Sequence, residues 1–298
     1  MVSDKFTKEI AALLKDRLGE VEVMVHNTEK NNGLCLTGLA IRGQGSNIAP
    51  CIYLEDFYPG YSEGRRSLED ITDEIIRIYH RGRVGHSFDL SAFTDYSRVR
   101  HLLHGRLVNT EKNMERLKGI PHREFLDLSL VYCVAFPCMG SQGAGIVQIT
   151  DKCMGLWKVS EQDLYEQAME NMAGADNAYI FSMADIFADI QACIPETTRK
   201  QASPMYVLTN RNKLDGAVQI LNSGALRKAA GIIGQDFFIL PSSIHETILV
   251  PAGETDTAPE ELAAAVCEVN EEAVPEEEFL SGHVYHYCTA DGQITIAA

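Results

Sequence analysis

The β-rich runs of this chain come in neighbouring pairs, and single helical segments separate the pairs. Residues 21–26 and 34–41 flank Asn31-Asn32-Gly33, and an Asn-Gly step supplies the positive φ angles of a tight hairpin turn. A regular alternation of one strand with one helix would favour a doubly wound parallel sheet. The pairing predicts instead the α+β class, with mostly antiparallel sheets, helices packed on them, and two lobes.

The first 95 residues predict an N-terminal domain with the order α-β-β-β-α. Residues 5–18 place apolar side chains on one helical face and charged ones on the other. A third β-rich run at 48–54 follows the hairpin, and a second helix begins near Ser67. Glycines and a proline loosen the pattern after this helix, so we expect residues 96–123 to connect this domain to a C-terminal α+β domain at 124–298.

The C-terminal domain is expected to repeat the pairing of strands. We predict strands at 125–136, 145–150, 156–159, 205–209, 217–221, 237–240 and 247–250, and a closing hairpin of 284–288 with 293–296. Helices are predicted from Ser160, where the hydroxyl can cap the first turn, at 223–233, and from Pro259 to about residue 269.

Charge is distributed unevenly along the chain, which has a formal net charge of -16. No Lys or Arg follows Lys228, whereas 13 acidic residues do. A basic partner could bind this acidic end, or the two kinds of charge could simply be solvated. The preceding basic stretch raises nucleic-acid binding as an alternative, although a pI near 5.0 disfavours it. The basic residues that would carry such binding are Arg98, Arg100, Arg106, Lys112, Arg116 and Arg123.

Eight cysteines without any Cys-x-x-Cys pair indicate buried reduced thiols rather than a disulfide framework. The first residues alternate charged and apolar side chains, unlike a signal peptide, and every apolar run is shorter than the roughly 18 residues that a membrane span needs. We therefore expect a cytoplasmic protein with no membrane partner.

Ser243, His245 and Glu246 form the densest group of a possible nucleophile, base and carboxylate. Neighbours in an extended segment diverge, however, and the chain has no Gly-x-Ser-x-Gly elbow. A turn stabilised by serine hydroxyls is the alternative interpretation.

Tyr53, Glu55 and Tyr58 gather at the end of a predicted strand, where they could line a ligand pocket or close a small core. Residues 140–145 are rich in glycine but match no phosphate-binding loop, which favours a hairpin turn. The pairs His101 with His104 and His283 with His286 have metal-like spacing but no diagnostic acidic ligand. We expect no metal and no other cofactor.

Several separate strings carry a resemblance to a known family. They are Asn31-Asn-Gly, Asn47-Ile-Ala-Pro-Cys-Ile-Tyr-Leu-Glu-Asp-Phe-Tyr58, Leu240-Pro-Ser-Ser-Ile-His-Glu246 and Glu268-Val-Asn270. Over nearly its whole length the chain resembles an uncharacterised bacterial family, the domain of unknown function number five-six-eight-eight, found mostly in anaerobic Gram-positive bacteria. The second half also looks distantly similar to family one-four-four-four. The resemblance implies a cytosolic bacterial protein and brings no known activity.

These observations favour a non-enzymatic intracellular protein that binds a protein partner or a small ligand. One alternative is a hydrolase-type enzyme with His245 as base and Ser243 as nucleophile or Glu246 as acid. The other alternative is nucleic-acid binding through the basic middle segment.

Overall fold

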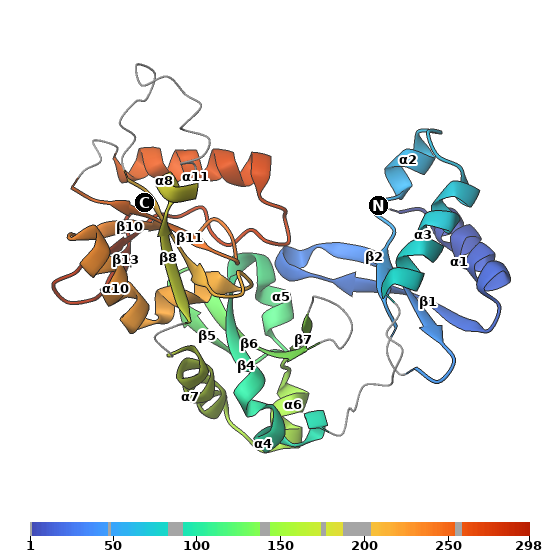
Figure 1. Ribbon diagram of the computed structural model, residues 1–298, viewed down its shortest axis with the longest axis horizontal. Coiled ribbons are helices and arrows are strands. Elements are labelled where there is room, and N and C mark those ends of the chain that lie inside the picture. The colour runs from blue at the N-terminus through green and yellow to red at the C-terminus, as the bar shows by residue number, and fades with distance from the viewer. Residues whose placement is uncertain are drawn as a thin grey trace. The chain divides into compact units, whose positions relative to one another are not determined.

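Two compact units make up the chain, and helices lie on sheets in both (Figure 1). The computed structural model describes residues 2–46, 49–82, 92–137, 144–173, 177–186, 204–253 and 258–298. The first unit consists of Met1–Asp95 with Pro137–Gly145, and the second of Tyr96–Phe136 with Ile146–Ala298. The three sheets are mostly antiparallel, which confirms the predicted α+β class.

The first unit contains a three-stranded antiparallel sheet of order β1-β2-β3. Strand β1 (Val21–Glu29) pairs with β2 (Cys35–Gly43), and β3 (Cys51–Tyr53) pairs with the other edge of β2. At the turn, Asn32 and Gly33 have φ angles of 61° and 73°. These are the left-handed conformations that Asn and Gly tolerate best, so the predicted hairpin is confirmed.

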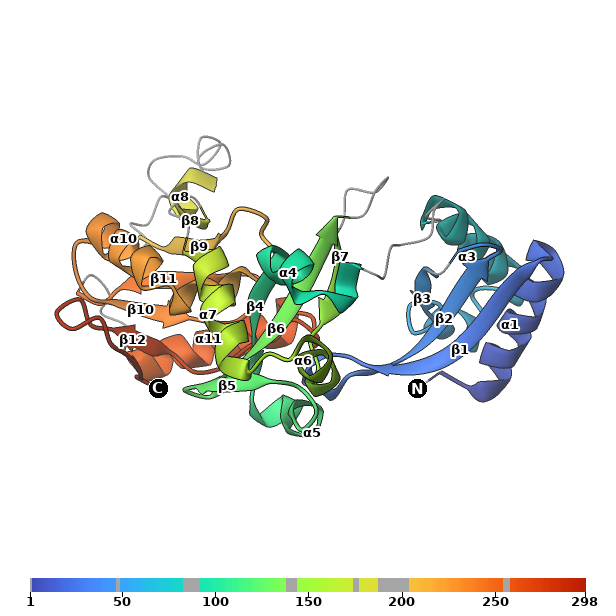
Figure 2. The same cartoon turned by 90° about the horizontal axis from the view of Figure 1, so that it is seen from below.

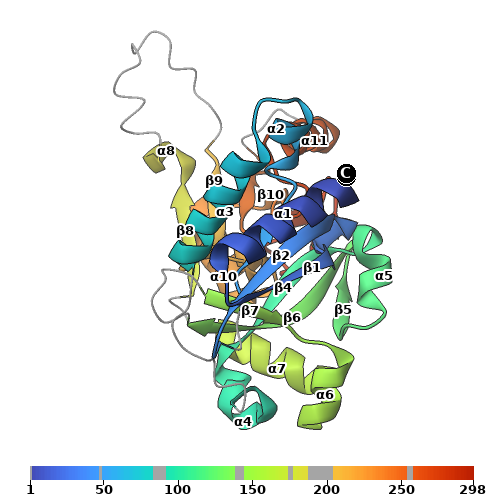
Figure 3. The same cartoon turned by 90° about the vertical axis from the view of Figure 1, so that its right-hand side faces the viewer.

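Two amphipathic helices cover one face of this sheet. Helices α1 (Asp4–Leu18) and α3 (Leu68–Gly82) cross the same face of the strands (Figure 3). Phe6 of α1 and Ile75 of α3 are fully buried in one cluster with Leu39 of β2. The apolar stripe that predicted each helix is therefore the surface that it buries.

The second unit contains a four-stranded sheet in which β6 pairs with the other three strands (Figure 2). The strands are β4 (Leu103–Asn109), β5 (His122–Phe125), β6 (Leu128–Pro137) and β7 (Ala144–Gln148). Helix α7 (Glu161–Met172) packs against β4 and begins with a capping box between Ser160 and Asp163. Strand β4 lies within residues 96–123, the segment expected to connect two domains. In the structure this strand pairs with β6 and belongs to the second unit.

A six-stranded antiparallel sheet of order β13-β12-β10-β11-β9-β8 forms the rest of the second unit. Its strands are β8 (Ala178–Ser182), β9 (Tyr206–Asn210), β10 (Phe237–Leu240), β11 (Thr247–Pro251), β12 (Tyr285–Tyr287) and β13 (Ile294–Ile296). Helix α11 (Pro259–Ala273) buries Val266 against Leu240 and Val250 of the sheet. Helix α10 (Ser223–Ile233) also belongs to this unit. The predicted closing hairpin is confirmed as β12 and β13.

Two predicted strands are wrong. Residues 156–159 do not form a strand, because helix α6 (Asp151–Trp157) runs to Trp157 and Lys158 then ends it in a left-handed conformation with φ of 55°. Residues 217–221 lie in the 3₁₀ helix η6 (Gly216–Leu221), most of which is buried. A short apolar run that is buried on all sides has no period that separates a strand from a helix.

Shorter helices complete the described chain: α2 (Tyr58–Ser62), α4 (Tyr96–Val99), α5 (Met114–Leu117), α8 (Met183–Ile186), η1 (Asn31–Gly33), η2 (Ala92–Thr94), η3 (Arg100–Leu102) and η4 (Glu111–Asn113). None of the helices in the described ranges combines the length and the apolar character needed to cross a membrane.

Candidate functional site

A pocket of about 380 Å³ opens beside β4 in the second unit. Its wall comes from η3, β4, β6, α7, the loop at 210–214 and η6, so residues far apart in the sequence meet there. The polar side chains that matter for its chemistry are His101, His104, Asn171, Asn210, Arg211 and Asn212.

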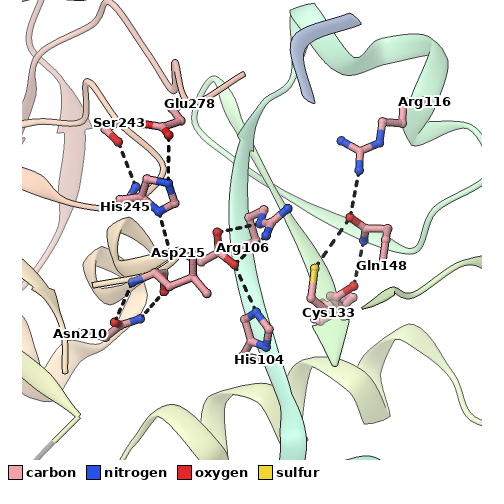
Figure 4. A network of polar contacts seen from close by, with 12 residues as sticks. His104, Arg106, Arg116, Cys133, Gln148, Asn210, Asp215, Ser243, His245 and Glu278 are labelled. Atoms are coloured by element: carbon pink, nitrogen blue, oxygen red, sulfur yellow. Dashed lines mark hydrogen bonds and ion pairs between the residues drawn. The ribbon is translucent and has the colours of Figure 1, made fainter. Parts of the chain in front are cut away.

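Asp215 is the centre of a polar network next to this wall (Figure 4). Its side chain is only 1% exposed, at the start of η6. Arg106 donates to both carboxylate oxygens, with Nε–Oδ1 and Nη2–Oδ2 distances of 2.8 Å each, and His104 Nε2 lies 3.2 Å from Oδ2. Arg106 and His104 are two residues apart on β4, so they point to the same face of the strand and reach one carboxylate.

The Asp215 carboxylate is ionised despite its burial. Burial alone would raise its pKa, but the hydrogen bond from His104 and the charge and hydrogen bonds of Arg106 outweigh this effect and hold the pKa below its ordinary value. Because an ionised carboxylate can only accept hydrogen bonds, Nε2 of His104 must carry the proton. The positive charge of Arg106 compensates the negative charge of Asp215, so the pair itself is close to neutral.

His245 lies on the other side of Asp215, in the segment between β10 and β11 (Figure 4). The backbone N–H of Asp215 donates to Nδ1 of His245 at 3.2 Å, which leaves the ring proton on Nε2, 3.6 Å from Oε1 of Glu278. The Ser243 hydroxyl oxygen accepts from the backbone N–H of His245 at 3.1 Å. Ser243 is therefore bonded to the backbone of His245 and not to its ring, and Glu246 is exposed.

A buried thiol lies on the same sheet as the Asp215 network. Cys133 of β6 is directly opposite His104 of β4 and is completely buried. Burial raises the pKa of the Cys133 thiol to about 11, although the charge of Arg106 partly opposes this. Gln148 of β7 lies 3.8 Å from its sulfur and accepts from Arg116 at 3.3 Å. A thiol with this pKa stays protonated at neutral pH and is a poor nucleophile.

The predicted ligand residues Tyr53, Glu55 and Tyr58 lie in the first unit and have different surroundings. Tyr53 lies under the ammonium group of Lys30, whose Nζ is 4.6 Å from the ring centroid. Glu55 Oε1 accepts from the backbone N–H of Thr37 at 2.8 Å. Tyr58 packs against the ring of Phe6 with centroids 5.3 Å apart, so it helps to close the core against α1.

Four of the six basic residues considered for nucleic-acid binding have side-chain contacts within the second unit. Arg123 binds Glu161 through two hydrogen bonds of 3.1 and 2.8 Å, and its guanidinium carbon lies 3.8 Å from the Tyr165 ring centroid. Lys112 Nζ lies 4.7 Å from the ring centroid of Phe279. Together with Arg106 and Arg116, these side chains are engaged by protein groups.

Three of the four paired histidines, His104, His283 and His286, each contact a single carboxylate. His283 Nδ1 lies 3.1 Å from Asp127, and His286 Nε2 lies 3.7 Å from Asp236. Within the described ranges, no three His, Cys, Asp or Glu side chains are grouped as metal ligands would be. Of the glycine-rich stretch at 140–145, residues 140–143 lie outside the part of the chain that the structure describes.

Sequence reasoning missed Asp215 and Arg211. Both lie in the stretch 210–216, whose polar residues and Asp-Gly step are typical of a turn. The partners of Asp215 on β4 are more than one hundred residues away in the chain. A turn signal was therefore visible in the sequence, but the contact that makes Asp215 special was not.

Comparison with known proteins places the chain in a family. The model of a family of unknown function, DUF5688, matches residues 3–289, so the chain belongs to this family. No curated protein and no solved structure matches it. The similarity of the second half to family one-four-four-four stays a prediction.

Proposed function

We propose that this member of the DUF5688 family is a non-enzymatic binding protein that takes up a small ligand in the pocket beside β4. The supporting observation is a wall whose amide side chains fix its shape. Asn171 donates to the carbonyl oxygens of Arg100 and Leu103 at 2.7 and 2.8 Å. Asn210 donates to the carbonyl of Leu214 at 2.6 Å and accepts from its N–H at 3.3 Å. Such a preformed site binds without a large ordering cost.

Other polar groups of the wall remain available to a ligand. The side chains of Arg211, Asn212 and His101 make no hydrogen bond or ion pair with any residue that the structure describes, and the His104 ring uses only its Nε2. The pocket volume is at the lower end of the range for small-molecule sites, about 300–1,000 Å³. These groups and this volume suit a compound of roughly monosaccharide size.

Binding is favoured over catalysis by the composition of the wall. None of the described residues that line the pocket is Ser, Thr, Cys, Lys, Asp or Glu, so the wall offers two imidazoles but no hydroxyl, thiol, amine or carboxylate nucleophile. The nearby Cys133 thiol is buried and protonated. The alternative, a hydrolase, would use Ser243, His245 and Glu246. It requires Nδ1 of His245 to give up its hydrogen bond from the backbone N–H of Asp215 and to accept one from the Ser243 hydroxyl instead.

We further propose a cytoplasmic, bacterial setting for this function. The six described cysteines, Cys35, Cys51, Cys133, Cys153, Cys267 and Cys288, are all free thiols. Free thiols on exposed positions persist in a reducing compartment.

A thermal-shift screen of the whole chain against nucleotides, sugars, sugar acids, sugar phosphates, amino acids and metal ions tests the proposal. A ligand that binds only the folded state stabilises it by about 2.7 kcal/mol when present at 100 times its Kd. Asn212→Trp fills the pocket from an exposed position and should abolish the shift. Lys228→Trp, on the exposed side of α10, is the matched control and should keep it.

The same screen separates binding from hydrolysis. His245→Ala should retain any shift that Asn212→Trp loses, because His245 does not line the pocket. A hit that is lost in His245→Ala and kept in Asn212→Trp would contradict the pocket as the site. Such a result would move the search to the Ser243 segment and to assays of ester and amide cleavage.

A further inference from the structure

The pocket wall has a charge opposite to that of the chain as a whole. The chain has a net charge of -16, yet the described residues that line the pocket include one Arg, two His and no acidic residue. Asp215 lies next to the wall, but its charge is compensated by the two hydrogen bonds from Arg106. A pocket with positive and no uncompensated negative side chains attracts anions.

Arg211 is the group best placed to bind an anion. It is exposed at the pocket and forms no ion pair with any described residue. The loop that holds it is fixed, because Lys213 donates from its backbone N–H to the carbonyl of Asn210 at 3.1 Å and both side-chain atoms of Asn210 bind Leu214. A guanidinium on a fixed loop presents a planar fork that matches phosphate and carboxylate oxygens.

His104 provides a second and different contact. Asp215 accepts the proton of Nε2, so Nδ1 is the hydrogen-bond acceptor whenever the ring carries a single proton. Nδ1 has no partner among the residues that the structure describes. Because the charge of Asp215 is already balanced by Arg106, Asp215 acts here by orienting the ring, as carboxylates orient imidazoles in many sites. The ring therefore suits a ligand hydroxyl that donates a hydrogen bond.

We propose that the pocket takes a small hydroxylated anion, with its phosphate or carboxylate on Arg211 and a hydroxyl group donating to Nδ1 of His104. This inference rests on the proposed binding function and specifies the class of ligand. Sugar phosphates and sugar acids share this chemistry, and they differ in which anionic group they carry.

Isothermal titration calorimetry of the full chain with two pairs of probes tests the class. Ribose 5-phosphate is compared with ribose, and glucuronate with glucose, so that the two members of each pair differ chiefly in the anionic group. We expect at least one anion to bind and neither neutral sugar to do so. Arg211→Gln should weaken the anion about tenfold or more, the loss expected for a hydrogen bond between charged groups. Arg227→Gln, which removes an exposed arginine of α10, is the matched control and should leave the affinity unchanged.

The hydroxyl contact has its own readout. His104→Leu should weaken ribose 5-phosphate by about tenfold while leaving the affinity for inorganic phosphate, which has no sugar hydroxyl, close to that of the wild type. Equal losses for both probes would overturn the assignment of His104. Preserved melting temperatures of Arg211→Gln and His104→Leu show that a loss of binding is not a loss of fold.

The outcomes distinguish this inference from the function on which it rests. If ribose or glucose binds as tightly as its anion and Asn212→Trp abolishes that binding, the preference for an anion is refuted and the pocket remains the binding site. Anion binding that survives Asn212→Trp would contradict the pocket itself. No measurable binding of any of the four probes at millimolar concentration would overturn the class, and the broader screen would then decide the pocket separately.

Discussion

Replacing Asp215 by Asn tests how the second unit holds its buried charge. Asn tolerates the left-handed backbone of this position, where φ is 55° and ψ is 27°, so the substitution removes charge with little backbone strain. The guanidinium of Arg106, whose side chain is 17% exposed, is left without its counter-charge. Removing one partner of a buried ion pair destabilises a protein by about 3–5 kcal/mol. Since Arg106 keeps partial access to water, we expect the lower end, about 3 kcal/mol.

Urea denaturation followed by the fluorescence of the single tryptophan measures this loss. Trp157 lies in the second unit and is buried, so its signal reports that unit. The matched control is Glu115→Gln, which leaves Lys118 without the carboxylate that it contacts at 2.6 and 2.7 Å, in a pair of the second unit whose side chains are 78% and 69% exposed. Exposed pairs contribute about 0–1 kcal/mol, so the control should lose much less. Equal losses in the two variants would refute the argument from burial.

The pH dependence of the same variant gives a second check. The native pKa of Asp215 lies below its ordinary value, so its contribution is present above the unfolded pKa of about 3.9 and is lost as the pH falls towards the native pKa. The stability difference between wild type and Asp215→Asn should therefore be constant at neutral pH and shrink below about pH 4. A difference that grows on acidification would contradict the ionised state assigned to Asp215.

Three further predictions concern the surroundings of the site. Gly216→Ala would bring a methyl group against the backbone carbonyl of His245, so it should lower the free energy of unfolding by about 3 kcal/mol or more in the same urea titration. The control, Gly231→Ala, lies in an open part of α10 and should raise the free energy of unfolding by up to about 1 kcal/mol. Ser160→Ala removes the capping box of α7 and should lower the free energy of unfolding by about 1 kcal/mol. Cys133 should resist iodoacetamide at pH 8 in the native protein and react only in urea, as mass spectrometry of the alkylated peptides would show.

Local signals in the sequence were enough to predict most elements of the fold. The hairpin of β1 and β2 was visible because Asn32 and Gly33 are the residues that a left-handed turn requires. The start of α7 was visible because Ser160 caps its own helix a few residues away. Both features depend on contacts between near neighbours, which a sequence displays directly.

Elements that depend on distant contacts were harder to predict. Strand β4 contains His104, Gly105 and Arg106 in its middle, which hides the alternation of a half-buried strand. The strand accommodates these residues because Gly105 leaves room for the side chains of Leu130 and Val218, while His104 and Arg106 both bind the carboxylate of Asp215. The polar pattern that disguised the strand is the same pattern that builds the site.

The position of Asp215 explains why one carboxylate matters for both fold and site. Its side chain binds β4 through Arg106 and His104, and its backbone N–H binds His245 in the segment between β10 and β11. A buried ion pair is by itself weak evidence for stability, because apolar residues of similar volume are often as stabilising. A role in orientation accounts better for the arrangement, since Arg106 balances the charge of Asp215 while the same carboxylate fixes the direction of the His104 ring. That combination is what a binding pocket needs when it must offer a hydrogen-bond acceptor beside the guanidinium of Arg211.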